Sequence, residues 1–150
     1  MNWPVFTAVA TAVTGFILLL TLGTIVWQIC RQNRANLAQA YANLISWVQN
    51  EEIRIARSKL FDLGDKQKKI EHWEQDEILA VEKVCHTYDT VGIMWREKIL
   101  PEKILVGWGI SIVRSWDIAK PLVIKYRKER PHPRLWENFE NLADKMKELL

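Results

Sequence analysis

Few residues in this 150-residue chain have both the type and the spacing that chemistry needs. The nearest approach to a metal site is Glu82 with His86, four residues apart on an expected helix. Helical di-iron sites need Glu-x-x-His, a spacing of three, and need it twice. His72 and His132 have no carboxylate or thiol at ligand spacing. We therefore expect no metal site and no cofactor.

The other reactive groups fit no catalytic pattern either. Cys30 and Cys85 are too few for a disulfide framework or a zinc site, and Cys85 lies on an apolar helix face typical of a core. Gly107-Trp108-Gly109 lacks the longer glycine spacing and the preceding strand of a phosphate-binding loop. No Ser-His-Asp or Cys-His spacing and no paired catalytic carboxylates are visible. The sequence therefore favours a role without catalysis and supplies no catalytic residues.

The elements that position these residues begin with an apolar run at the N-terminus. Val5–Cys30 carries no charged side chain. At about 1.5 Å per residue this run is long enough to cross a hydrocarbon core of roughly 30 Å. It is too long for a cleaved signal peptide and lacks the basic opening of one, so we expect it to be retained. We predict a transmembrane anchor over residues 1–30 and a second domain over residues 31–150.

The flanks of this run predict its orientation. Arg31 and Arg34 follow it directly, and no Lys or Arg precedes it. By the positive-inside rule the N-terminus faces out and the C-terminal domain lies in the cytosol, as a single-pass protein of the plasma (bacterial inner) membrane. Trp3 and Trp27 lie about 36 Å apart along a helix, which suits the two headgroup layers.

The chain after the anchor predicts an all-α fold. Helical patterns cover Arg31–Leu63, a segment from Trp73 to Gly92, a third that begins at Pro101-Glu102, and Leu135–Leu150, and none alternates like a strand. Helices joined by short turns predict an up-and-down four-helix bundle behind the transmembrane helix. Glu51 falls on the apolar face of the first of these helices. It is either a buried carboxylate that does chemistry or a solvated residue at the edge of the packing, and the second reading is the commoner one.

Two turns of this bundle gather positive charge. An up-and-down order places the turns at residues 64–75 and 125–134 together, at the end away from the membrane. This basic tip comprises Lys66, Lys68, Lys69, Lys125, Arg127, Lys128, Arg130 and Arg134. It could receive an acidic protein, a nucleotide or RNA, although basic turns are more often only solvated. The overall net charge of +3 is too small to indicate nucleic-acid binding by itself.

The third helix is apolar on two faces. One stripe contains Leu105, Trp108, Ile112, Trp116, Ala119 and Val123 and fits the core, and Pro121 is expected to kink or split the helix near Ala119. About 120° away lies a second face, which we predict to bind a partner helix. This partner face comprises Val106, Ile110, Val113 and Ile124.

Several segments together resemble one known family. They are the apolar run ending at Arg31, the sequence Tyr88-Asp89-Thr90-Val91-Gly92, the segment Trp116–Pro121, and the sequence from Trp136 to Ala143. In these the chain resembles a bacterial family of small single-span proteins known only as a domain of unknown function. The resemblance implies a membrane-anchored helical module with no assigned activity and no catalytic residues.

These observations lead to two functional hypotheses. The first is a membrane-anchored cytosolic module for interaction or scaffolding, without catalysis, whose partners are the lipid bilayer and either another protein or a second copy of the chain. The alternative is a bundle that binds an anionic ligand, a nucleotide or RNA at the basic tip, with or without catalysis. The sequence names neither the partner nor the oligomeric state.

Overall fold

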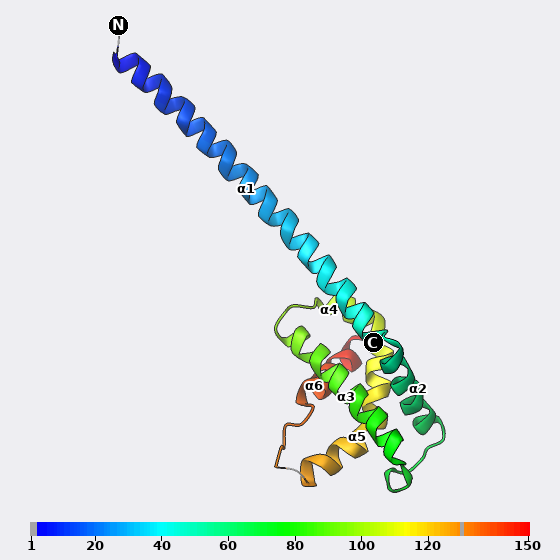
Figure 1. Cartoon of the computed structure of the whole chain (residues 1–150). Coiled ribbons are helices and arrows are strands. Elements are labelled where there is room, and N and C mark those ends of the chain that lie inside the picture. Colours follow the sequence, from blue (N-terminus) through cyan, green and yellow to red (C-terminus); the bar gives the residue numbers. More distant parts are fainter. Residues whose placement is uncertain (1–2, 130) are drawn as a thin grey trace. The chain divides into compact units, whose positions relative to one another are not determined.

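The computed structural model describes residues 3–129 and 131–150, and every regular element within them is helical (Figure 1). The all-α class is confirmed. The longer helices are α1 (Trp3–Val48), α2 (Glu51–Asp65), α3 (Gln75–Arg96), α5 (Gly109–Glu129) and α6 (Glu137–Leu149). Shorter turns of helix are η1 (Ile70–His72), α4 (Glu102–Leu105) and η2 (Val106–Trp108). The chain divides into two compact units, residues 1–43 and residues 44–150.

The first unit is helix alone and carries the apolar run. The segment Thr7–Val48 is long and apolar enough to cross a membrane, and its most apolar window has a mean hydropathy of 2.2 and no buried residue. The hydroxyls of Thr7, Thr11 and Thr21 each donate to a backbone carbonyl four residues earlier, at 2.8–2.9 Å. Because these polar groups are satisfied within the helix, they add little cost to placing it in lipid.

The predicted helix from Arg31 to Leu63 is interrupted, which corrects the sequence analysis. α1 ends at Val48, and α2 begins at Glu51 behind Asn50, whose side chain accepts a hydrogen bond from the Glu52 backbone N–H at 3.1 Å. Asparagine is a favoured residue at this capping position. The acidic first turn of α2 also suits the positive end of its dipole.

This break turns a different face of the second segment toward the core. Leu44 and Val48 are buried before the break, whereas Ile55, which a continuous helix would place on the same face, is exposed after it. The buried residues of α2 are Ile53, Ala56, Leu60 and Leu63. Glu51 is exposed in the first turn of α2, so the solvated reading of this carboxylate is correct.

The core of the second unit lies where α3, α5 and α6 meet. The expected core position of Cys85 is confirmed, and Val81 and Tyr88 of the same helix are buried with it. The Phe139 ring of α6 stacks on Tyr88 at 5.2 Å between ring centroids and meets Trp116 of α5 edge-on at 5.1 Å. Aromatic pairs of this kind contribute about 0.5–1.5 kcal/mol each beyond the area they bury. α2 completes the bundle by packing against α3 and α5.

The third predicted helix begins as expected but is not one continuous helix. Pro101 precedes α4, and the chain passes through the tighter turn η2 before α5 begins at Gly109. α5 then runs through Pro121 without ending, so the predicted split near Ala119 does not occur. The Pro121 ring is exposed, on the side where a helix tolerates a missing hydrogen bond most easily.

The start of α6 is held by α3. One carboxylate oxygen of Asp89 accepts hydrogen bonds from the backbone N–H groups of Asn138 and Phe139, at 3.0 and 3.1 Å. These donors have no partner within their own helix, since they belong to its first turn. Gly92, one turn further along α3, lies so close that a Cβ atom there would be 2.3 Å from the Asn138 carbonyl oxygen. Gly92 therefore permits a backbone contact that any larger residue would prevent.

We predict that Gly92→Ala destabilises the bundle by about 2 kcal/mol or more, because the added methyl group must displace backbone rather than a flexible side chain. Gly107→Ala is the matched control, since a Cβ atom at Gly107 meets nothing within 4 Å. The measurement is urea unfolding of the full chain in a mild detergent, followed by tryptophan fluorescence. Equal unfolding midpoints for the two variants would contradict the assigned role of Gly92.

Candidate functional site

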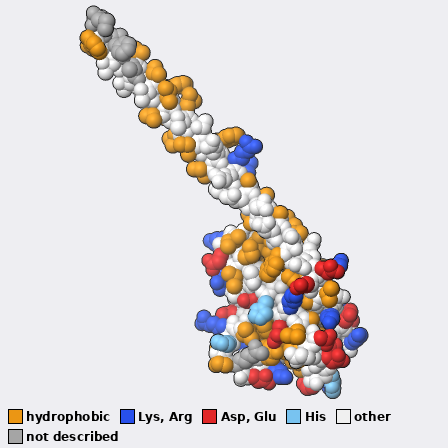
Figure 2. All heavy atoms as spheres, in the orientation of Figure 1, with side chains coloured by type: hydrophobic (Ala, Val, Ile, Leu, Met, Phe, Trp, Pro, Cys, Tyr) orange, Lys and Arg blue, Asp and Glu red, His pale blue; other side chains and the backbone are white. Residues whose placement is uncertain are grey.

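The turns predicted to form the basic tip lie at one end of the bundle. Figure 1 shows the connection between α2 and α3 and the C-terminal end of α5 at the end opposite α4. Within the described residues, the exposed lysines of this end that form no ion pair are Lys66, Lys69, Lys125 and Lys128. Arg130, also predicted to belong to the tip, lies outside the described residues. On the face seen in Figure 2, acidic and basic side chains are intermixed over this end.

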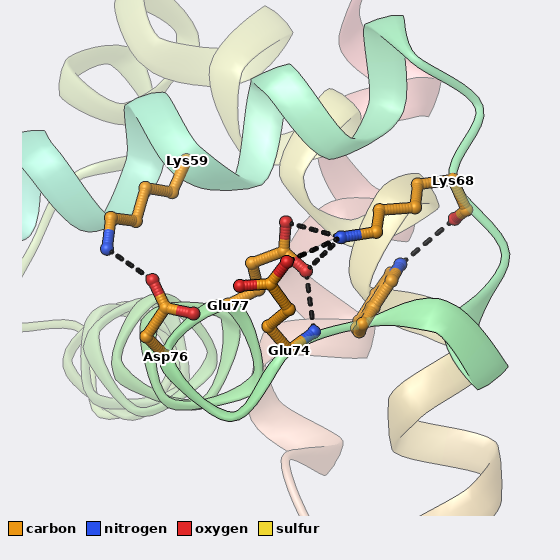
Figure 3. A network of polar contacts seen from close by, with 6 residues as sticks. Lys59, Lys68, Glu74, Asp76 and Glu77 are labelled. Carbon is orange, nitrogen blue, oxygen red and sulfur yellow. Dashed lines mark hydrogen bonds and ion pairs between the residues drawn. The ribbon is translucent and has the colours of Figure 1, made fainter.

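The side chain of Lys68 is already paired with carboxylates of the same bundle (Figure 3). Its ammonium group donates to both carboxylate oxygens of Glu77, at 2.7 and 2.9 Å, and lies 3.9 Å from Glu74. Glu77 also accepts the backbone N–H of Glu74 at 2.7 Å, which caps the start of α3. The indole N–H of Trp73 donates to the Lys68 carbonyl at 2.9 Å. Lys68 therefore fastens the turn between α2 and α3.

The side chain of Arg127 also has partners within the bundle. Its Nε donates to the Leu135 carbonyl at 2.9 Å and its Nη1 to Glu140 at 2.7 Å, so it ties the chain before α6 back to α5. Arg134 lies 3.8 Å from Glu137, one turn along. The sequence analysis gave all basic residues of the tip the same role, because the pairs Lys68–Glu77 and Arg127–Glu140 form through tertiary packing and leave no local sequence pattern.

The predicted partner face has an exposed part and a packed part. Ile110 is 74 % exposed, and Val106 and Ile124 are also exposed, whereas Val113 packs against the core. Along α5, the exposed Asp117 lies between Val113 and Ile124 and pairs with Lys147 at 2.8 Å. The apolar surface around Ile110 is therefore separate from Ile124.

Ile110 and Val113 line a groove between α2 and α5 with a volume of about 370 Å³. Ile118, Gly64 and Leu150 line it as well. A second hollow of about 430 Å³ shares Ile118 and Gly64 with the first and continues toward Ile70 and Lys69. We call these two hollows together the α2–α5 groove. The pairs Arg114–Asp65 and Lys147–Asp117 place charges beside its apolar lining.

The sequence analysis missed two residues of this groove. Ile118 lies about 115–125° around the helix from each of the two predicted stripes of α5, so its helical phase assigned it to neither. Leu150 was assigned to the closing helix, yet its side chain reaches Gly109, where a Cβ atom would lie 3.2 Å from it. Only the fold brings Leu150 beside Ile110.

A third hollow, of about 500 Å³, lies between α3 and the chain before α6. It is lined by His86, Asp89, His132, Arg134 and Trp136, among others. The indole N–H of Trp136 donates to His86 Nδ1 at 3.3 Å, and Asp89 is occupied in capping α6. In the described part of the chain, no three His, Cys, Asp or Glu side chains gather as metal ligands. The polar groups of this hollow serve mainly to join α3 to α6.

Comparison with known proteins bears on the predicted resemblance. A family model described as Domain of unknown function (DUF4760) matches residues 8–146. The chain belongs to this family. The expected membership in a family known only as a domain of unknown function is thereby confirmed over most of the chain. No curated protein and no solved structure matches.

Three of the four segments that carried the resemblance to DUF4760, all in the second unit, meet in one place. Tyr88 and Trp116 both contact Phe139, while Asp89 and Gly92 hold the backbone at Asn138. These residues build the junction of α3, α5 and α6. They explain how the fold closes and point to no reaction.

We predict that Lys68→Met destabilises the bundle near neutral pH and has little effect in acid. The pKa of Glu77 lies below its ordinary 4.5, chiefly because its carboxylate accepts a hydrogen bond from the Lys68 ammonium group. The hydrogen bond from the Glu74 backbone N–H lowers this pKa further. A carboxyl group whose pKa is lower in the folded state stabilises the fold at pH values above its ordinary pKa. That contribution is lost as the pH falls through the pKa of the folded state. The measurement is urea unfolding of both proteins from pH 7 to pH 3.

Lys66→Met is the matched control, because Lys66 is exposed and forms no side-chain ion pair within the described residues. Its unfolding curve should follow that of the unaltered protein at every pH. A loss of stability in Lys68→Met that is the same at pH 7 and pH 3 would show that the Glu77 pair is not its cause.

Proposed function

We propose that this protein is a single-pass, membrane-anchored helical module whose cytosolic bundle binds a protein partner through the α2–α5 groove. The N-terminus faces out, and the role needs no catalysis. The partner is another protein or a second copy of the chain.

The observation that carries this proposal is the exposure of Ile110 beside an apolar groove. Ile110 is 74 % exposed and Leu150 is 61 % exposed, and both line the same hollow. Burying apolar surface gains about 25 cal/mol per Å², so this surface is a ready source of binding energy. The neighbouring pairs Arg114–Asp65 and Lys147–Asp117 resemble the polar rim of a protein interface around an apolar centre.

Three features support the membrane anchor. Within the described residues, no residue of the most apolar window of α1 is buried. The guanidinium of Arg31 lies 5.4 Å from the centre of the Trp27 ring, a cation–π contact that suits the boundary between lipid and water. Arg31 and Arg34 follow the apolar run while no basic residue precedes it, which favours the cytosolic side for the bundle.

A second candidate function rests on the basic tip. Lys66, Lys69, Lys125 and Lys128 are exposed and form no ion pair among the described residues. They could bind an anionic ligand, a nucleotide or RNA through charge attraction. Lys68 and Arg127 contribute less to such binding, because internal carboxylates already engage them.

For the orientation, we expect a fluorescent protein that matures only in the cytosol to be active when fused after Leu150 in a bacterial host. A phosphatase that is active only outside the cytosol should be inactive at the same position. Replacing Arg31 and Arg34 together by Glu should weaken this asymmetry, since it removes the charges that set orientation. Phosphatase activity in the unaltered chain would overturn the proposed topology.

For the partner groove, we expect a photo-crosslinking residue at Ile110 of the full chain in native membranes to give one discrete adduct. Leu150→Asp should lower the adduct yield at least about tenfold, the effect of roughly 1.4 kcal/mol in binding. Leu79→Asp is the control, since Leu79 is exposed on α3 and does not line the groove. Co-expressing two differently tagged copies distinguishes a second copy from another protein.

Two outcomes would count against the groove. Equal yields in the Leu150→Asp and Leu79→Asp variants would remove it as the binding surface. A yield unchanged by Leu150→Asp but lost when Lys66, Lys69, Lys125 and Lys128 are replaced by Glu would favour the basic tip instead.

A further inference from the structure

The turn between α3 and α4 presents an apolar side chain to solvent. Ile99 is 47 % exposed at this turn, and Ile93, in the last turns of α3, is also exposed. Leu100, the next residue, is 2 % exposed and belongs to the core. The turn is therefore anchored from beneath by Leu100, while Ile99 points outward.

The backbone of this turn is held firmly. Lys98 has a left-handed conformation, with φ 57°, and its N–H donates to the Trp95 carbonyl at 2.9 Å. The N–H groups of Ile99 and Leu100 both donate to the Met94 carbonyl, at 2.9 and 3.2 Å. These bonds satisfy carbonyl groups at the end of α3. The exposure of Ile99 is therefore a property of an ordered turn.

Positive side chains flank Ile99. Lys98 and Lys103 are exposed and form no ion pair within the described residues, whereas Arg96 bonds to Glu97 at 3.1 Å and to Asn138 at 2.6 Å. A hollow of about 500 Å³ beside the turn is lined by Trp95, Arg96, Lys98, Leu100, Pro101 and Glu102. Isoleucine and tryptophan beside lysines form the combination that segments embedded in a lipid interface use.

The position of this turn in the bundle also favours contact with the membrane. Figure 1 shows it at the end where α2 and α5 begin, opposite the basic tip. The chain reaches the bundle from the apolar run through residues 31–43, which measure about 20 Å as a helix. From Arg31 to Asn50 the chain carries two arginines and no acidic residue. A tether this short and this positive keeps the bundle close to an anionic lipid surface.

We propose that the turn between α3 and α4 is a second membrane contact, in which Ile99 enters the headgroup layer and Lys98 and Lys103 meet lipid phosphates. This inference rests on the membrane anchor proposed above. The aliphatic stems of the two lysines can lie along Ile99 while their ammonium groups stay among the phosphates. The contact would hold the bundle against the bilayer and leave the α2–α5 groove, lined by other residues, for the partner.

The test places a fluorescent probe at position 99 of the full chain. Cys30→Ser removes the exposed thiol, and burial raises the pKa of the Cys85 thiol, so that Cys85 reacts poorly. An environment-sensitive label is then attached to Ile99→Cys and, as the matched control, to Leu79→Cys, since Leu79 is 55 % exposed in the first turns of α3, at the other end of that helix from Ile99. Both proteins are reconstituted in phosphatidylcholine–phosphatidylglycerol vesicles that contain nitroxide-labelled lipid.

We expect the nitroxide lipid to quench the probe at position 99 several-fold more strongly than the probe at position 79. Lys98→Glu with Lys103→Glu should reduce this quenching toward the control level. Equal quenching at the two positions would overturn the proposal. A probe at position 99 that is shielded from water but not quenched by lipid would also overturn it, in favour of a protein contact.

Vesicle flotation separates a failure of this inference from a failure of the anchor. A labelled chain that floats with the vesicles but shows no excess quenching at position 99 refutes only the second contact. A chain that does not float refutes the anchor as well. Unchanged circular dichroism and melting temperature of each labelled variant confirm that the bundle is folded.

Discussion

The bundle depends on the close approach of α6 to α3 at Gly92. The Asn138 carbonyl fills the space that a side chain at Gly92 would need, and Asp89 satisfies the first N–H groups of α6 from the neighbouring helix. Phe139 follows directly and places its ring against Tyr88 and Trp116. Trp136, the residue just before α6, has a left-handed conformation and its side chain does not cap the helix, so the start of α6 is defined by α3.

The two ends of the bundle differ in how they use charge. At the basic tip, Lys68 and Arg127 hold turns in place by pairing with Glu77 and Glu140, so their positive charges are already paired within the fold. The turn between α3 and α4 is stabilised by backbone hydrogen bonds and by the buried Leu100. Lys98 is thereby left exposed beside Ile99. Charge density in the sequence is thus a poor guide to which end is available for binding.

Helical periodicity predicted the class of the fold and most of its core, because burial of one face repeats every 3.6 residues. Val81, Cys85 and Tyr88 are examples that any helical projection finds. The break at Asn50 was missed because a capping asparagine interrupts a helix without glycine or proline. The groove was predicted only in part, since Ile110 shows in the pattern of α5 while Leu150 reaches it through tertiary packing. The pairing of Lys68 joins a turn to α3 and the capping by Asp89 joins α3 to α6, so neither could be derived from helical periodicity.

The capping of α6 by Asp89 also has a consequence for biosynthesis. Helices leave the ribosome in chain order, so α3 and α5 are complete before α6 emerges. Until then the rings of Tyr88 and Trp116 lack the Phe139 ring that covers them in the finished bundle. The nascent chain would therefore pass through an open three-helix stage with exposed aromatic surface. Translational pausing before Trp136 would prolong that stage and increase the demand for chaperones.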